Sequence, residues 1–185
     1  MRTLKVPSVL HDVLGETASP VQIAVIVVFG VGVATGVTEL LRPGLPVLPW
    51  WRVAIGWALT ADIAAGCIAN FTRSTNDFYA KRPLNRWVFI AIHVHVIVVA
   101  AAFGVGLAPA IAVWMYTIAG ASAVNLLSGR GTQVLVAGLL LAVGIGWIPL
   151  LPGVPAPVLV VLLLFLLKVL FSFAVDHYRD PACAR

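Results

Sequence analysis

One lysine lies in the middle of a segment that is otherwise almost entirely apolar. Lys168 falls within 158–175, where Ser172 is the other polar residue, and this run is long enough to cross a bilayer. A cation at the centre of a membrane helix costs about 2.5–3.5 kcal/mol on insertion scales, so such a residue indicates a partner or a function that offsets the cost. Lys168 therefore marks a candidate polar site inside a membrane.

Three other residues are predicted to lie at the depth of Lys168. Asp62 is near the middle of the second long apolar run, and His93 and His95 are near the middle of the third. A carboxylate that faces an ammonium offsets part of the cost of burying both, and an imidazole exchanges a proton near neutral pH. Such a set suits proton coupling, an anion or carboxylate site, or acid–base chemistry on a lipophilic substrate. An ion pair of this kind can also serve only to fix the register of the helices.

The His93-x-His95 pattern does not predict a metal site. Residues two apart on an ideal helix point about 200° away from each other, so the two rings should not face one ion. Helical metal ligands are typically three or four residues apart. We favour His95 as the site residue because of its depth, keep His93 as the second choice, and expect no metal and no cofactor.

Four residues form a second group, which we expect to contribute to substrate binding. Asn70 and Asn125 lie near the ends of the second and fourth apolar runs, and Tyr116 adds a hydroxyl. Arg73 lies near the start of a polar loop, 72–83, that either binds an anionic headgroup or simply sets the topology. Hydrogen bonds between helices are the simpler explanation for the amides and the hydroxyl, but together the group predicts a polar path from the site to one face.

The composition is that of a polytopic membrane protein. The chain has 185 residues, of which 61% are hydrophobic and 10% charged, whereas a soluble domain carries roughly 25% charged residues. The net charge of +5 therefore reports topology and contact with anionic lipid rather than nucleic acid. The sequence has no P-loop, no GxSxG and no DDxxD, so nucleotide hydrolysis, serine hydrolase chemistry and magnesium–diphosphate chemistry have no support.

The hydrophobic pattern predicts an all-α bundle of six transmembrane helices, because a spanning helix needs about 20 mostly apolar residues. The predicted spans are 20–41, 50–71, 86–107, 109–128, 131–150 and 157–176. Residues 1–19 then form an N-terminal segment, 20–176 one membrane domain, and 177–185 a C-terminal tail. The third and fourth runs almost touch in sequence, which predicts a tight antiparallel hairpin.

The distribution of lysine and arginine predicts the orientation. Six spans place both termini on one side, and that side collects nine cations: Arg2, Lys5, Arg73, Lys81, Arg82, Arg86, Arg130, Arg179 and Arg185. The other side has only Arg42 and Arg52. Since cytoplasmic loops carry the excess of positive charge, we expect both termini in the cytoplasm and the protein in the cell membrane.

Small residues predict close contacts between helices. Gly32 and Gly36 form a GxxxG pattern in the first span, and such residues let helix backbones approach closely. Packing within the bundle is the simplest explanation, and an interface of a homo-oligomer is the alternative.

These features favour a proton-linked transporter or channel for a small or anionic solute. The first alternative is a membrane enzyme that acts on a lipid or isoprenoid-like substrate by acid–base chemistry. The second is an accessory or structural subunit whose polar groups only fix the packing. The expected partners are the lipid bilayer and a lipophilic or anionic small molecule, with no nucleic acid.

Overall fold

Six helical crossings account for most of the chain in the computed structural model, which describes residues 3–44 and 47–179. Each is long and apolar enough to span a membrane, so the prediction of an all-α protein with six such helices is confirmed, and the protein has the features of an integral membrane protein. The crossings are α2 (Pro20–Leu41), α3 (Trp50–Ala69), α5 with α6 (Pro83–Ile92 and His95–Phe103), α7 (Leu107–Leu126), α8 with η3 (Gln133–Trp147 and Ile148–Leu150) and α9 with η4 (Ala156–Leu166 and Leu167–Phe173).

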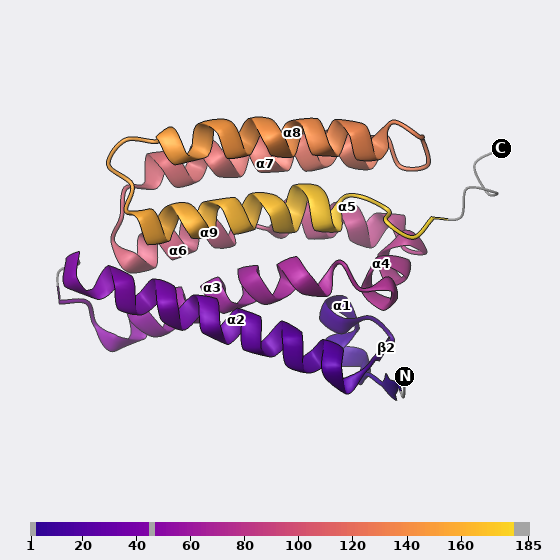
Figure 1. Ribbon diagram of the computed structural model, residues 1–185, viewed down its shortest axis with the longest axis horizontal. Helices are drawn as coiled ribbons and strands as arrows, with labels where there is room; N and C mark the ends of the chain where they lie inside the picture. Colours follow the sequence, from indigo (N-terminus) through magenta and orange to yellow (C-terminus); the bar gives the residue numbers. More distant parts are fainter. Residues whose placement is uncertain (1–2, 45–46, 180–185) are drawn as a thin grey trace.

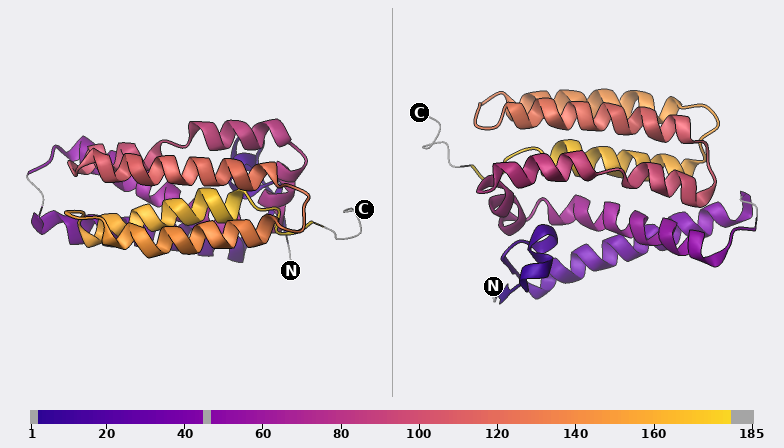
Figure 2. Two further views of the ribbon diagram at one scale, coloured as in Figure 1. Left: turned by 90° about the horizontal axis from the view of Figure 1, so that it is seen from above. Right: turned by 180° about the vertical axis from the view of Figure 1, so that it is seen from behind.

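The crossings are stacked in three layers (Figures 1 and 2). Helices α2 and α3 form one layer, the α5–α6 crossing and α9 the middle layer, and α7 and α8 the third. Both ends of the chain lie at the same end of the bundle, which we call the terminal end. Arg2 and Arg185, which contribute to the predicted orientation, lie outside the described residues.

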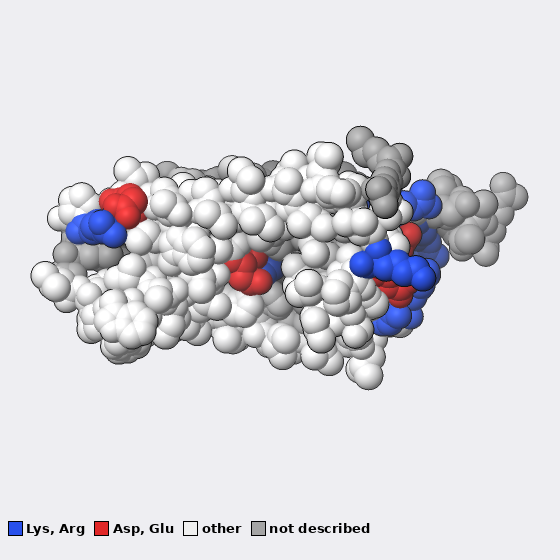
Figure 3. Space-filling view, turned by 90° about the horizontal axis from the view of Figure 1, so that it is seen from below, with Lys and Arg blue, Asp and Glu red and all other residues white. Residues whose placement is uncertain are grey.

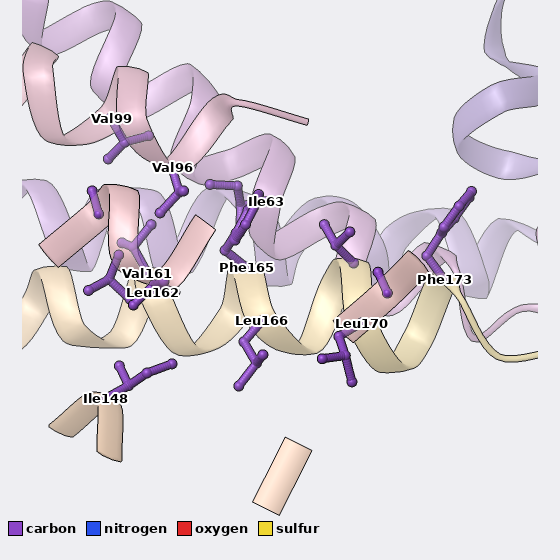
Figure 4. Close-up of a cluster of buried hydrophobic side chains, with 14 of the residues drawn as sticks. Ile63, Val96, Val99, Ile148, Val161, Leu162, Phe165, Leu166, Leu170 and Phe173 are labelled. Carbon is purple, nitrogen blue, oxygen red and sulfur yellow. The ribbon is translucent and has the colours of Figure 1, made fainter. Parts of the chain in front are cut away.

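The last crossing occupies the centre of the bundle. It contacts α3, α6, α7 and α8. It is also the most buried of the six crossings, since 56% of its most apolar 18 residues are buried. Phe165, Leu166 and Leu170 are fully buried there, and Phe165 packs toward Ile63 of α3 (Figure 4). Lipid offers no hydrophobic contrast, so close packing of this kind holds the helices together. The same packing fixes the position of Lys168, one turn beyond Phe165.

The third crossing is interrupted in its middle. α5 ends at Ile92, His93 has φ −77° and ψ 77°, and α6 begins at His95 (Figure 2). The indole N–H of Trp114 donates to the His93 carbonyl at 2.9 Å, so a neighbouring helix satisfies a backbone group that the break exposes. Non-helical backbone at membrane depth is tolerated where it is buried in protein or lines a cavity. The crossing predicted over 86–107 is therefore present as Pro83–Phe103, but its helix is broken at His93 and Val94.

The crossing that carries Lys168 also departs from α-helical geometry. η4 is a π-helix over Leu167–Phe173, and the Ser172 hydroxyl donates to the Lys168 carbonyl at 2.9 Å. Single π-turns inside α-helices are frequent at functional sites. The irregular segments of the third and sixth crossings thus hold the histidines and the lysine that the sequence singles out.

The N-terminal segment folds against a short helix that lies between α3 and α5. Its strands β1 (Leu4–Lys5) and β2 (Thr17–Ala18) pair antiparallel around η1 (Ser8–Leu10) and α1 (His11–Leu14). The short helix is α4 (Arg73–Ala80), within the polar loop 72–83. Thr75 Oγ1 donates to the Val13 carbonyl at 3.3 Å, and Arg82 pairs with Glu16 at 3.2 Å.

Gly15 allows this close docking. It has φ 71° and ψ −169°, a conformation essentially restricted to glycine, and a Cβ there would lie 2.4 Å from the backbone carbon of Ser74. We expect Gly15→Ala to release the N-terminal segment from α4, at a cost of about 1–3 kcal/mol. Hydrogen exchange should accelerate in α1 and α4, whereas Gly131→Ala, where a Cβ meets nothing within 4 Å, should leave it unchanged. Equal exchange in the two variants would contradict this account of the docking.

The GxxxG pattern does not pack inside the bundle. A Cβ at Gly32 or Gly36 would meet nothing within 4 Å, so both positions face outward from α2. Gly30 makes the close contact instead, since a Cβ there would lie 2.9 Å from Ala65 Cβ on α3. The simplest explanation of the pattern, packing within the bundle, is therefore wrong for Gly32 and Gly36.

Candidate functional site

One carboxylate oxygen contacts both an ammonium and an imidazole in the interior of the bundle. Asp62 Oδ2 lies 2.7 Å from Lys168 Nζ and 3.0 Å from His95 Nδ1. Asp62 and Lys168 each follow the first residue of their crossing by 12 residues, which places both about 18 Å along helices that start at the same end. Three crossings therefore supply the ion pair and the imidazole at one depth.

The ammonium of Lys168 is enclosed by protein. The side chain is only 3% exposed, and Nζ also donates to the Asp62 carbonyl at 3.3 Å. Gly66 makes room for it one turn after Asp62, because a Cβ there would lie 2.5 Å from Lys168 Cε. Nζ also lies 6.0 Å from the centroid of the Phe89 ring. Lys168 is thus held by its counter-charge and by a matched gap in α3.

The break in the third crossing brings both histidine rings to this site. The ring centroids of His93 and His95 are 4.9 Å apart, and both side chains line the same cavity as Asp62. His93 is buried, stacks on Phe89 at 3.7 Å, and has Nδ1 against the Phe89 carbonyl. The prediction that the His93 and His95 side chains point about 200° apart is therefore wrong, because it assumed an unbroken helix. His95 is the ring that contacts the carboxylate, and His93 lies behind it.

The cavity has a volume of about 380 Å³ and extends from the ion pair toward the terminal end. Polar residues follow its length: Asn70 at the end of α3, Asn85 at the start of α5, and Tyr79 and Asp12 from α4 and α1. Tyr79 donates to the Asp12 carbonyl at 3.1 Å, and burial together with the nearby Asp12 carboxylate raises the pKa of Tyr79. The phenol therefore keeps its proton and remains a hydrogen-bond donor at the terminal end of the cavity, where the N-terminal segment forms part of the lining.

Apolar residues border the side of the cavity. Val88 and Ile92 of α5 line it and are also 50% and 61% exposed on the outside of the bundle. In the space-filling view, one red group with a blue group behind it lies halfway along a face that is otherwise uncharged between its ends (Figure 3). The cavity thus has an apolar border that reaches the outer surface of the bundle, in addition to the polar residues along its length.

Only one of the four residues expected to bind substrate lines this cavity. Asn70 does so, whereas Arg73 is exposed and pairs with Asp77 at 3.5 Å. Tyr116 donates to the Leu140 carbonyl at 2.6 Å, and Asn125 is buried on α7; neither is among the cavity residues. The structure does not bring these three to the ion pair.

Several residues that shape the site are not among those predicted from the sequence. Asp12 and Tyr79 reach the cavity from segments outside the spans, and their contact depends on tertiary packing that no local pattern reveals. Gly66 carried a detectable signal, because it lies one helical turn after Asp62 and so shares its face. Asn85 stands near the start of the third crossing, where a polar residue is ordinarily exposed.

Metal ligation has no geometric support in the described part of the chain. Residues 3–44 and 47–179 contain no group of three or more His, Cys, Asp or Glu side chains placed to hold a metal ion. The structure defines a class: an all-α protein with six helices long and apolar enough to span a membrane, and a cavity that reaches the ion pair of the enclosed Lys168 with the half-exposed Asp62. No protein-family model, curated protein or solved structure matches the chain.

Proposed function

We propose that the protein is a proton-coupled transporter of the cell membrane. The observation that carries this proposal is the sharing of Asp62 Oδ2 by Lys168 and His95 within a cavity that has polar access from one end. A change of charge at any of the three groups alters the cost of burying the other two. Binding of a solute beside Asp62 can therefore be coupled to the gain or loss of a proton.

His95 is the proposed route for that proton. Its side chain is 29% exposed, compared with 3% for Lys168, so it meets both the cavity and the carboxylate. An imidazole can accept a proton on one nitrogen and release one from the other near neutral pH. We assign His95 to carry protons between the cavity and the Asp62–Lys168 pair, and His93 to hold the broken backbone beside it.

The proposed orientation places the terminal end in the cytoplasm. Basic groups gather at this end of the molecule, and the opposite end shows one acidic and basic pair (Figure 3). Cytoplasmic surfaces of membrane proteins carry the excess of lysine and arginine. The polar cavity would then open inward, with the apolar core around Val99 and Phe103 closing the outer half.

Replacement of His95 tests the coupling. Purified protein in liposomes with trapped pyranine would be exposed in turn to acetate, phosphate, guanidinium and benzyltrimethylammonium. We expect at least one solute to change the internal pH, and His95→Asn to slow that change by about tenfold or more, since a positioned proton carrier contributes at least this much. His177→Asn is the control, because that ring lies against the Phe171 carbonyl outside the cavity. Responses equal to those of protein-free liposomes would refute proton-coupled transport.

A membrane enzyme remains the second candidate because of the apolar border at Val88 and Ile92. A lipophilic substrate could enter there from the bilayer and place its polar end at Asp62. Incubation with a total lipid extract followed by mass spectrometry would detect its product. Turnover that is lost in Asp62→Asn, without any solute-driven change of pH, would favour the enzyme over the transporter.

A further inference from the structure

The charge that the cavity presents to a ligand is negative. The Asp62 side chain is 42% exposed, whereas Lys168 is 3% exposed and lies behind it. Oδ2 makes both contacts of the carboxylate, which leaves Oδ1 to meet a ligand. A ligand that reaches the pair therefore meets the carboxylate before the ammonium.

A second carboxylate increases this negative character. Asp12 lines the cavity at the terminal end, and Lys168 is the one lysine or arginine among the described residues that line it. Two aspartates and one lysine give a formal charge of −1 when both histidines are neutral. An anion in this cavity would approach two carboxylates, and the Lys168 ammonium that could attract it is enclosed by protein. The cavity therefore disfavours an anionic solute, which was one of the solutes expected from the sequence.

The walls select for an apolar body next to the charge. Val13, Val88, Phe89 and Ile92 line the space between the two carboxylates, and the volume of about 380 Å³ lies in the range of small-molecule sites. Both faces of the Phe89 ring are covered, by His93 and by Phe173, so the ring offers an edge rather than a face. Recognition of the charge therefore rests on Asp62 and Asp12 rather than on an aromatic cage.

We infer that the solute is an organic cation with an apolar body, which pairs with Asp62 and displaces a proton from the site. This inference rests on the proposed function for its transport step, but the binding step stands independently. The charged and titratable groups that face Asp62 are Lys168 from η4, His93 and His95 from the third crossing, and Asp12 and Tyr79 across the cavity.

The proton displacement follows from charge balance. When a cation pairs with the Asp62 carboxylate, the buried Lys168 ammonium loses part of its counter-charge, and an uncompensated charge in this position is costly. Loss of the ammonium proton to water through His95 leaves a neutral amine and restores the total charge of the site. One cation enters and one proton leaves, which is the stoichiometry of an antiporter.

Benzyltrimethylammonium and phenylmethanesulfonate test this inference, because they have nearly the same shape and opposite charge. Binding to the purified full-length protein would be measured by equilibrium dialysis, with binding to protein-free micelles subtracted. We expect the cation to bind at least about tenfold more tightly than the sulfonate, a difference of about 1.4 kcal/mol. The quaternary ammonium carries no dissociable proton, so release of one proton per cation in weak buffer would come from the protein.

Two variants and one control keep the test decisive. Asp62→Asn should reduce cation binding at least about tenfold. Asp12→Asn, at the terminal end of the cavity, should reduce cation binding less, and this variant replaces Asp62→Asn in the test if Asp62→Asn does not fold. Asp77→Asn should leave binding unchanged, because that carboxylate pairs with Arg73 outside the cavity.

The outcomes separate this inference from the proposed function. Equal or tighter binding of the sulfonate, or cation binding that neither aspartate variant weakens, would overturn the cation inference. Proton-coupled movement of acetate or phosphate in liposomes would then leave the proposed transport function in place. Asp62-dependent cation binding without any movement of protons across liposomes would instead support the cation site and refute the transporter.

Discussion

Liposomes that contain the Asp62→Asn variant are expected to show no solute-driven change of internal pH. Asparagine keeps the shape of the side chain but removes the charge that holds Lys168 Nζ at 2.7 Å. The proton carrier His95 then has no carboxylate at the end of its route, so we expect the rate to fall at least about a hundredfold. Pyranine fluorescence in the same liposomes measures the effect.

The same substitution should also destabilise the protein. It leaves the enclosed Lys168 ammonium without a counter-charge, which costs about 3–5 kcal/mol when one partner of a buried pair is removed. The double variant Asp62→Asn/Lys168→Met should recover most of the thermal stability in detergent but none of the transport. Normal transport in either variant would reduce the ion pair to a device that fixes helix register.

Gly66→Ala is expected to impair the site without changing any charged group. The new Cβ would lie 2.5 Å from Lys168 Cε and 2.9 Å from Nζ, so the ammonium must move away from the Asp62 carboxylate. We expect transport to fall at least about tenfold and the stability to fall by about 1–3 kcal/mol, as for other overpacked interiors. Flux in liposomes and thermal unfolding in detergent measure the two effects.

Gly32→Ala is the matched control for this prediction. It makes the same substitution on the neighbouring helix α2, where a Cβ meets nothing within 4 Å. Alanine is the better helix former by roughly 0.5–1 kcal/mol, so this variant should be at least as stable as the wild type and equally active. If Gly66→Ala matches Gly32→Ala in both measurements, the ammonium does not depend on the gap that Gly66 provides.

The number of crossings and the depth of the polar residues could be predicted from the sequence. Apolar runs of about 20 residues identify membrane helices, and a fixed rise of 1.5 Å per residue converts position into depth. Depth predicts that Asp62, His95 and Lys168 lie together, and the structure places Asp62 in contact with both of the others. Depth alone does not fix which face of a helix a residue occupies. Tyr116 and Asn125, which the sequence predicts to contribute to substrate binding, are not among the residues that line the cavity.

The break beside His93 had no local signal. The stretch from Ala91 to Val96 contains neither proline nor glycine, so nothing in it marks the end of a helix. The break is stabilised by groups far away in the sequence, such as the Trp114 indole that donates to the His93 carbonyl. The docking of the N-terminal segment on α4 is also non-local, since it joins Asp12 to Tyr79 across 67 positions.

The separation of Asp62 from Lys168 in the chain has a consequence for biosynthesis. The two residues are 106 positions apart, and the lysine belongs to the last crossing. At about 5–20 residues per second, the ribosome needs roughly 5–20 s to make the intervening chain. The helix that carries Asp62 is therefore inserted before the lysine that pairs with this carboxylate has been synthesised. Insertion of the sixth helix completes the centre of the bundle and pairs the acid with the lysine in one event. A nascent chain that stops short of this helix would therefore present an incomplete bundle and an Asp62 without its ammonium to the quality-control proteases of the membrane.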